Sequence, residues 1–206
     1  MKKGGEKMEY IPIQCKSAIR KVRGGMPYQH DVNIYRGCEH GCLYCYALYS
    51  HDYLDDEKFY DHIYYKENIV EILEKEISKP SWQKNIINFG SVSDSYQPCE
   101  KELGLMREVL KLMIRYQNPV NISTKSTLIL RDIDLLAELS KVAAVNLTCT
   151  VTCADESIQQ VIEPRAATSL ERMKVLQILK QKTNASVGIL MMPNIPYINI
   201  HCLCPL

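Results

Sequence analysis

Three cysteines, Cys38, Cys42 and Cys45, lie close enough in sequence for their thiolates to converge on one metal centre. Their spacing is C-x3-C-x2-C, and Gly37 and Gly41 let the loop curl back on itself, because glycine tolerates positive φ. A tetrahedral structural zinc site takes four ligands, usually in two separated pairs. Three clustered thiolates without a fourth therefore favour a 4Fe–4S cluster that leaves one iron open for a small molecule.

Polar side chains also follow three later apolar runs. Gly90-Ser91-Val92-Ser93-Asp94 follows the apolar run at 85–89, and Lys125 follows the run at 120–123. Glu163-Pro164-Arg165 lies after the run at 143–150. Ligands of α/β barrels bind at the carboxyl ends of the strands, so the hydroxyls and the carboxylate of the first segment are candidate ligand contacts, and the Arg165 guanidinium suits a carboxylate. Each has a plainer alternative: a helix cap for Asp94, a surface lysine for Lys125 and a structural salt bridge for Arg165.

These residues need a scaffold of alternating strands and helices to position them. Short, nearly continuous apolar runs predict strands buried on both faces of a parallel sheet. Longer segments with apolar residues at helical spacing predict the helices between them. The expected strands are Asp31–Tyr35, Asn85–Phe89, Val120–Ser123, Ala143–Thr150 and Ser186–Met191, and the expected helices are Asn68–Ser78, Leu105–Tyr116, Ile133–Leu139 and Leu170–Leu179. This order predicts an α/β fold with right-handed crossovers.

Composition narrows the class of protein. The 206 residues are 46% hydrophobic and 24% charged, which excludes a disordered chain, a collagen-like fibre and a coiled coil. The net charge of +1 does not indicate nucleic-acid binding, although residues 1–25 carry seven Lys or Arg against two acidic residues. This basic segment is either an arm that contacts a phosphate backbone or a solvated leader.

Cysteine content and hydropathy bear on the compartment. Nine cysteines without an apolar signal sequence indicate a reducing cytoplasm, where cysteines serve metal or redox chemistry. No stretch has the about 18 apolar residues of a membrane helix, so we expect no membrane partner.

Five ordered motifs resemble one family. The cysteine motif, with Tyr44 just before Cys45, resembles the radical S-adenosylmethionine (SAM) superfamily, in its branch related to spore photoproduct lyase and often described as DNA repair photolyase-like. The further matching segments are Asn33–Ala47 around the cysteines, Ser93–Pro98, Ser123–Ser126 with Leu130–Leu136, Ile162–Arg165 and Pro193–Pro196. The resemblance covers roughly residues 28–199.

The resemblance implies a fold and a chemistry. The fold is a partial (β/α)6 TIM-like barrel of parallel strands. A 4Fe–4S cluster held by the three cysteines binds SAM at its open iron, and one electron from a reductant such as flavodoxin or ferredoxin cleaves SAM to a 5′-deoxyadenosyl radical. That radical abstracts hydrogen from a substrate, for which the family label alone suggests nucleic acid. The protein supplies position and exclusion of water.

The resemblance also implies which residues bind SAM, while no catalytic residue is assigned. It sets Tyr44 and Tyr46 against the adenine, although one of the two could belong to the core. It directs Ser123 and Lys125 toward SAM, with the lysine suited to the methionyl carboxylate. The Gly-Gly-Glu-like segment of the family reads Gly90-Ser91 here, so Ser91, Ser93 and Asp94 take its place, and Arg165 serves either SAM, substrate or structure.

The chain departs from the family pattern at its end. The fifth motif is followed by Ile200–Leu206 instead of a sixth strand and helix, so we expect one βα unit to be missing, as in a truncated or frameshifted gene. The expected organisation is a basic arm at 1–27, a radical SAM core at 28–199 and an atypical tail at 200–206. The alternatives to a radical SAM enzyme are a non-catalytic metal-binding module and an inactive truncated remnant.

Overall fold

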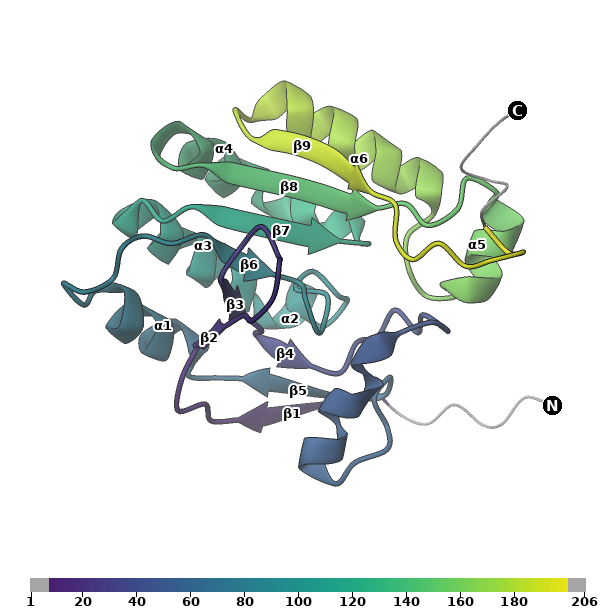
Figure 1. Ribbon diagram of the computed structural model, residues 1–206, viewed down its shortest axis with the longest axis horizontal. Coiled ribbons are helices and arrows are strands. Elements are labelled where there is room, and N and C mark those ends of the chain that lie inside the picture. Colours follow the sequence, from purple (N-terminus) through teal and green to yellow (C-terminus); the bar gives the residue numbers. More distant parts are fainter. Residues whose placement is uncertain (1–7, 200–206) are drawn as a thin grey trace.

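The chain folds around a six-stranded, mostly parallel sheet. The computed structural model describes residues 8–199, and its main sheet has the order β2-β3-β6-β7-β8-β9 (Figure 1). Neighbouring strands are parallel except for the antiparallel pair β2–β3. The strands are β2 (Ile19–Lys21), β3 (His30–Val32), β6 (Ile87–Phe89), β7 (Val120–Thr124), β8 (Val145–Thr150) and β9 (Ser186–Leu190). The arrangement confirms a partial barrel of parallel strands, in which β9 is an edge strand among the described residues.

Four helices pack side by side along one face of this sheet (Figure 1). They are α1 (Ile69–Ile77), α3 (Leu105–Tyr116), α4 (Ile133–Val142) and α6 (Ser169–Lys182). Each presents apolar residues at helical spacing, and in α1 the buried set is Ile69, Leu73 and Ile77. The chain enters α6 through a capping box between Thr168 and Glu171, which satisfies two free N–H groups of the first turn. The four helices predicted from periodicity are confirmed.

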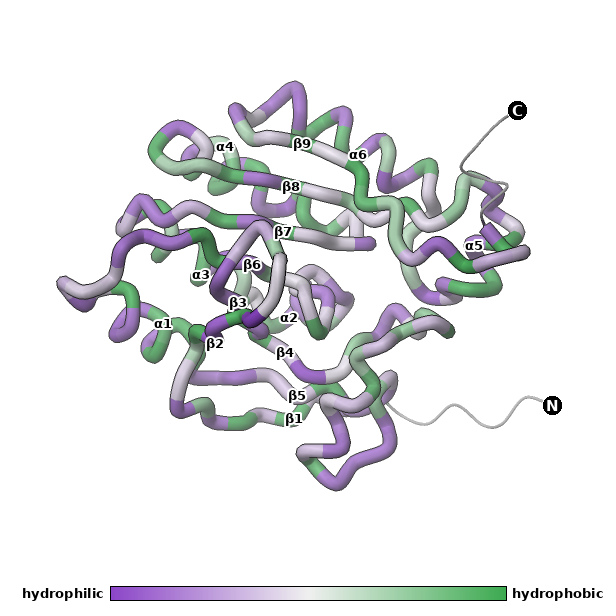
Figure 2. Tube along the Cα trace, in the orientation of Figure 1, coloured by the Kyte–Doolittle hydropathy of each residue, from purple (hydrophilic) through white to green (hydrophobic). Residues whose placement is uncertain are grey.

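The opposite face of the sheet is polar. One in-register layer across β3, β6, β7 and β8 consists of Asp31, Asn88, Asn121 and Asn146. Asn88 Nδ2 donates to Asp31 Oδ1 at 2.8 Å, and Asn146 Nδ2 donates to Asn121 Oδ1 at 2.5 Å. Figure 2 shows hydrophilic and hydrophobic residues along β8, as expected for a strand with one face of each kind. This layer of the barrel interior therefore consists of one carboxylate and three amides.

A second sheet of three strands lies beside the first, with the order β1-β5-β4 (Figure 1). It comprises β1 (Glu9–Ile13), β4 (Tyr35–Arg36) and β5 (His62–Lys66). Strands β1 and β2 therefore lie within the segment expected to be an arm at 1–27. The pairing of β1 with a strand about 50 residues later is not visible in a local pattern. The domain boundary at residue 27 stays a prediction, and the tail at 200–206 lies outside the described residues.

The first expected strand, Asp31–Tyr35, is divided between the two sheets as β3 and β4. The interruption falls at Asn33, whose Oδ1 accepts hydrogen bonds from Ser91 Oγ and from the Val92 N–H, both at 3.1 Å. A side chain that bonds to a neighbouring loop fixes the point at which the strand leaves the barrel sheet.

The remaining elements are short and connect the strands. They are the 3-10 helices η1 (Tyr46–Ser50), η2 (Asp52–Leu54) and η3 (Thr127–Asp132), and the α-helices α2 (Glu100–Leu103) and α5 (Glu156–Ile162). No helix among residues 8–199 is long and apolar enough to cross a lipid bilayer.

Candidate functional site

The three cysteines lie in the loop between β4 and η1, at one end of the barrel. Cys42 is buried, and Cys38 and Cys45 are partly buried. Burial raises the pKa of the Tyr60 hydroxyl, and the charges of Cys45, Cys42 and Cys38 raise it further. The same hydroxyl donates to the Cys42 carbonyl at 2.8 Å. Tyr60 is therefore hydrogen-bonded to the cysteine loop.

Two glycines make this loop geometry accessible. Gly37 has φ +83°, and a Cβ there would lie 2.6 Å from the carbonyl oxygen of His62. Gly41 has φ +68°, and a Cβ would lie 3.0 Å from Arg165 Nε. Both positions need positive φ and close approach, which only glycine combines without strain. This confirms the predicted curl of the loop at Gly37 and Gly41.

Buried side chains fasten the loop to the segment after β6. The Glu39 N–H donates to Gln97 Oε1 at 2.9 Å, and Gln97 Nε2 donates to the Gly37 carbonyl at 3.2 Å. In return the Cys99 N–H donates to Glu39 Oε1 at 2.6 Å. Glu39 and Gln97 are both buried, so these bonds form away from water and hold the cysteine loop in one position.

Asp94 joins three segments of the site. Its Oδ1 accepts from Thr124 Oγ1 at 2.7 Å and from the Tyr96 N–H at 2.8 Å. Its Oδ2 accepts from the Lys125 N–H at 2.7 Å and contacts His40 Nε2 at 3.1 Å. A carboxylate offers about four acceptor positions, and protein donors occupy all four here. Asp94 thus positions the loop, and its expected contact with SAM stays a prediction.

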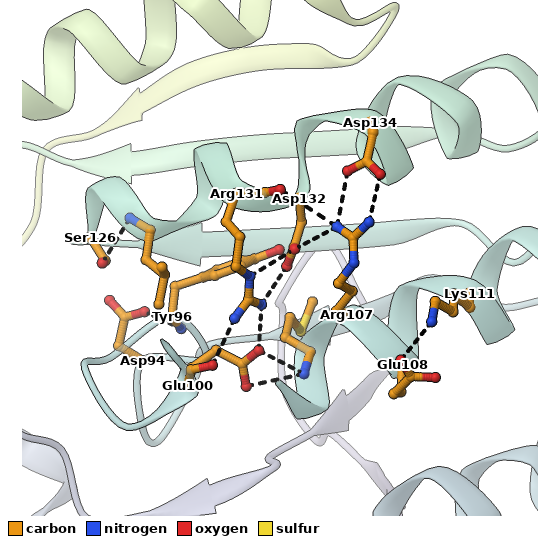
Figure 3. Close-up of polar contacts among 12 residues, drawn as sticks. Asp94, Tyr96, Glu100, Arg107, Glu108, Lys111, Ser126, Arg131, Asp132 and Asp134 are labelled. Atoms are coloured by element: carbon orange, nitrogen blue, oxygen red, sulfur yellow. Dashed lines mark hydrogen bonds and ion pairs between the residues drawn. The ribbon is translucent and has the colours of Figure 1, made fainter. Parts of the chain in front are cut away.

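An ion network lies next to the Asp94 segment (Figure 3). Arg131 Nη2 contacts Glu100 Oε1 at 2.5 Å and Asp132 Oδ2 at 2.7 Å, and Arg107 Nη1 contacts Asp132 Oδ1 at 3.0 Å. The carboxylates of Glu100 and Asp132 are fully buried, and burial raises the pKa of Glu100. The network ties α2, which follows the Asp94 segment, to η3, which follows Lys125.

Lys125 and Tyr44 lie together beside the cysteines. The Lys125 ammonium is 5.7 Å from the centre of the Tyr44 ring. Its positive charge lowers the pKa of Cys42 and of Cys45, although burial raises both more strongly and brings Cys42 to about 11. The charge of Lys125 thus acts on two of the three thiols, while its expected contact with SAM stays a prediction.

The hydroxyl of Tyr44 donates to Glu163 Oε1 and lies 3.1 Å from Thr152 Oγ1. Glu163 is fully buried and also accepts from Arg172 Nη2 at 2.5 Å. Tyr44 is therefore fixed at its hydroxyl end, while its ring faces the Lys125 ammonium.

The other expected SAM-binding residues occupy different parts of the site. Tyr46 is 70% exposed, and its hydroxyl donates to the Ser91 carbonyl. Ser93 is buried, and its hydroxyl donates to the Tyr35 carbonyl at 3.0 Å. Ser123 Oγ lies 2.8 Å from Thr148 Oγ1, on the polar inner face of the sheet. Ser93 thus makes a structural bond, while Tyr46 and Ser123 line accessible surfaces.

Arg165 covers the cysteine loop from the side of α5. Its backbone N–H donates to the His40 carbonyl at 3.2 Å, and its guanidinium lies 5.9 Å from the centre of the Tyr60 ring. Its Nη1 is 3.4 Å from Asp61 Oδ1, a long and partly exposed ion pair. Both alternatives weighed for Arg165 therefore remain open, because a weak surface pair leaves the guanidinium free to turn.

The expected ligation of a 4Fe–4S cluster by Cys38, Cys42 and Cys45 stays a prediction. Within residues 8–199, no group of three or more Cys, His, Asp or Glu side chains is arranged to hold one metal ion. A 4Fe–4S cluster binds each thiolate through a different iron, so its ligands surround it at wider spacing. Cys38, Cys42 and Cys45 are all free thiols.

Sequence reasoning missed several residues that shape the site. Glu163, Arg172 and Tyr60 carry no assigned role there, although Glu163 belongs to the Glu-Pro-Arg motif. Glu39 and Gln97 also lie within quoted motifs and fasten the loop. Glu163, Glu39 and Gln97 could have been found because each lies in a motif that resembles the family, but such a motif does not identify which of its side chains acts. Tyr60 and Arg172 lie outside the motifs and had no such signal.

Comparisons with known proteins agree with the motifs. A family model described as the Radical SAM superfamily matches residues 32–201. An uncharacterized protein of Mycobacterium tuberculosis is 31% identical over 173 residues, which cover 82% of this chain and 51% of the relative. An uncharacterized protein of Methanocaldococcus jannaschii is 31% identical over 175 residues, covering 84% of this chain and 63% of the relative.

Solved structures resemble the fold. Spore photoproduct lyase complexed with dinucleoside spore photoproduct superposes with a TM-score of 0.70 at 11% identity, covering 91% of this chain and 52% of that one. A double mutant of that lyase, with bound AdoMet and dinucleoside spore photoproduct, has a TM-score of 0.68 at 11% identity and covers 89% of this chain and 51% of that one. This chain thus spans about half the length of the solved lyase, and about half the length of the mycobacterial protein that it matches.

Proposed function

This chain belongs to the radical SAM superfamily, and on that premise we propose that Cys38, Cys42 and Cys45 hold a 4Fe–4S cluster whose fourth iron binds SAM. When bound, the cluster and SAM together supply a carbon-centred radical that abstracts hydrogen from a substrate. The observation that carries the proposal is one loop, curled at Gly37 and Gly41, that presents three free thiols between β4 and η1.

The protein's own contribution is to position the cofactors and keep water away. Lys125 suits the carboxylate of SAM, because its ammonium forms no ion pair among the described residues and rests on the Tyr44 ring. Tyr44 and the exposed ring of Tyr46 suit stacking against adenine. Ser91 and Ser123 suit hydrogen bonds to SAM, the buried Ser93 holds the segment to the Tyr35 carbonyl, Asp94 orients the Lys125 backbone, and Arg165 covers the loop.

The identity of the substrate is a separate part of the proposal. A lyase-like reaction on nucleic acid is supported by the fold it shares with spore photoproduct lyase, whose solved complexes contain a dinucleoside photoproduct. The polar inner face of the sheet also suits a substrate that makes hydrogen bonds. A reductant such as flavodoxin or ferredoxin and a cytoplasmic location belong to the same proposal, since free thiols need a reducing environment.

Anaerobic reconstitution with iron and sulfide tests cluster binding. We expect the broad visible absorption of a 4Fe–4S cluster, and formation of 5′-deoxyadenosine after addition of SAM and a chemical reductant. Cys42→Ala should abolish both signals, whereas Cys149→Ala, which removes a buried thiol from β8, should preserve them.

Three outcomes distinguish the proposal from its alternatives. Stoichiometric zinc without cluster absorption would identify a non-catalytic metal-binding module. A cluster that binds SAM without any 5′-deoxyadenosine would identify an inactive remnant. A cluster that survives Cys42→Ala would contradict the ligand assignment itself.

A further inference from the structure

A small pocket lined by three cations lies apart from the cysteines, where β2, β4, β5 and the two 3-10 helices η1 and η2 meet. Its volume is about 60 Å³, and Arg20, Arg36 and Lys66 line it together with Tyr49 and Tyr53. Arg20 comes from β2, Arg36 from β4 and Lys66 from β5, so both sheets contribute. No role in the radical chemistry proposed above accounts for this pocket.

The three cations have no acidic partner within the described part of the chain. Lys66 Nζ donates to the Asn33 carbonyl at 2.5 Å, and Arg36 Nη1 donates to the Ser50 carbonyl at 3.3 Å. Carbonyl oxygens orient a cation but do not neutralise it. The positive charge of the pocket is therefore available to an anion.

The charge of the Glu76 carboxylate raises the pKa of Lys66, but Glu76 forms its hydrogen bonds with other groups. It accepts hydrogen bonds from the N–H groups of Ala18 and Ile19 and from the Ser17 hydroxyl. These bonds hold it at the start of β2, away from an ion pair with Lys66.

Burial and mutual repulsion make this arrangement costly for a free protein. Burial, followed by the charges of Arg36 and Arg20, lowers the pKa of Lys66 to about 8. Burial and Arg20 likewise lower the pKa of Arg36. Because like charges in a half-buried pocket oppose folding, an anion bound among them would relieve the repulsion.

Two exposed aromatic rings border the same pocket. Tyr49 is 47% exposed and Tyr53 is 76% exposed, and their ring centres are 6.4 Å apart at an interplanar angle of 82°. A planar ring beside a cation cluster suits a ligand that carries a phosphate and a base, because bases stack on aromatic side chains while cations hold the phosphate.

We propose that this pocket binds the phosphate group of a nucleotide, held by Arg20, Arg36 and Lys66, with the exposed Tyr53 ring as the stacking surface for the base. The helix η1 connects Cys45 directly to Tyr49 and Ser50, so a nucleotide bound here lies one short helix away from the third cysteine. The site does not depend on a bound cluster, so it can be tested separately from the proposed radical chemistry.

Thermal unfolding of the 206-residue chain tests the site with inorganic phosphate, with thymidine monophosphate and with a fluorescein-labelled thymidine decamer. We expect phosphate to raise Tm, because a ligand that binds the folded state stabilises it, and the monophosphate to raise Tm further. Fluorescence anisotropy of the decamer distinguishes a free nucleotide from one within a strand. Tyr53→Ala should reduce the effect of the monophosphate to that of phosphate.

Lys66→Gln and Lys21→Gln form a matched pair for this test. Both remove one positive charge, but Lys21 is exposed on β2 and does not line the pocket. We expect Lys66→Gln to weaken binding of phosphate and monophosphate about tenfold or more, as loss of a charged hydrogen bond implies, and to leave the ligand-free Tm unchanged or higher. Lys21→Gln should leave both properties unchanged. Arg36→Gln provides a second pocket variant.

Specific results would overturn the proposal. If Lys66→Gln and Arg36→Gln lower the ligand-free Tm without changing the response to phosphate, the cations are structural. If Lys21→Gln weakens binding as much as Lys66→Gln does, the response reflects diffuse surface charge. Equal shifts with phosphate and monophosphate would exclude the stacking role of Tyr53.

Discussion

The Lys125 ammonium lies 5.7 Å from the centre of the Tyr44 ring, and this pair joins the end of β7 to the cysteine loop. The Lys125 backbone is held at the same time by Asp94, through an N–H bond of 2.7 Å. The ammonium forms no ion pair among the described residues, although its charge lowers the pKa of the buried Glu163 behind the Tyr44 hydroxyl. Such a cation is ready to receive the carboxylate of a ligand.

Lys125→Met should weaken SAM binding about tenfold or more, because a charged hydrogen bond contributes about 1.5–3 kcal/mol. Cluster absorption should remain, since the thiols are unchanged. Anaerobic equilibrium dialysis with labelled SAM measures the affinity. Lys141→Met, which removes an exposed lysine near the end of α4, is the matched control and should leave the affinity unchanged. Unchanged affinity in Lys125→Met would refute this role.

Gly37→Ala should prevent cluster assembly and lower the free energy of unfolding by more than about 1 kcal/mol. The new Cβ would lie 2.6 Å from the His62 carbonyl oxygen, which belongs to β5 and cannot move without disturbing the small sheet. Iron content after reconstitution and urea denaturation measure the two effects. Gly104→Ala is the control, because Gly104 also has positive φ, +65°, but open space around its Cβ position. That variant should keep its cluster, and a Gly37→Ala protein with full iron content would contradict the prediction.

Local periodicity predicted the four longer helices and every strand of the main sheet except β2, because each depends on residues a few positions apart. It did not predict β1, whose partner β5 lies about 50 residues away, or the break at Asn33, which depends on the loop at Ser91. The three cysteines were visible because their spacing is itself the signal. The four donors that surround Asp94 come from three segments, so only the folded chain reveals them.

Arg172→Met should lower the free energy of unfolding by about 3–5 kcal/mol, because it leaves a buried carboxylate without its partner. Both side chains of this pair are fully buried, and Arg172 Nη2 lies 2.5 Å from Glu163 Oε2. Glu163 also accepts a hydrogen bond from the Tyr44 hydroxyl. Urea denaturation measures the loss. Arg115→Met breaks an exposed pair with Glu74 and should cost at most about 1 kcal/mol. Equal losses in the two variants would show that burial does not govern the Glu163 pair.

Acid unfolding should depend on Asp56. Burial opposes its ionisation, but hydrogen bonds from the Tyr64 hydroxyl at 2.6 Å, the Lys58 N–H at 2.8 Å and His62 Nδ1 at 2.8 Å lower its pKa to about 2. The folded-state pKa lies below the unfolded value of about 4, so the folded state holds its proton less tightly. The stabilisation is therefore complete above about pH 4 and is lost as the pH falls through about 2.

Asp56→Asn tests this dependence. The amide cannot ionise, so the variant should be less stable than the parent at pH 6, and the difference should shrink steadily between pH 4 and pH 2. Chemical denaturation at a series of pH values measures it. Asp52→Asn, a change of the same charge at a nearby exposed position, should show no such convergence. A constant difference between Asp56→Asn and the parent across that range would mean that the carboxylate of Asp56 does not titrate with folding.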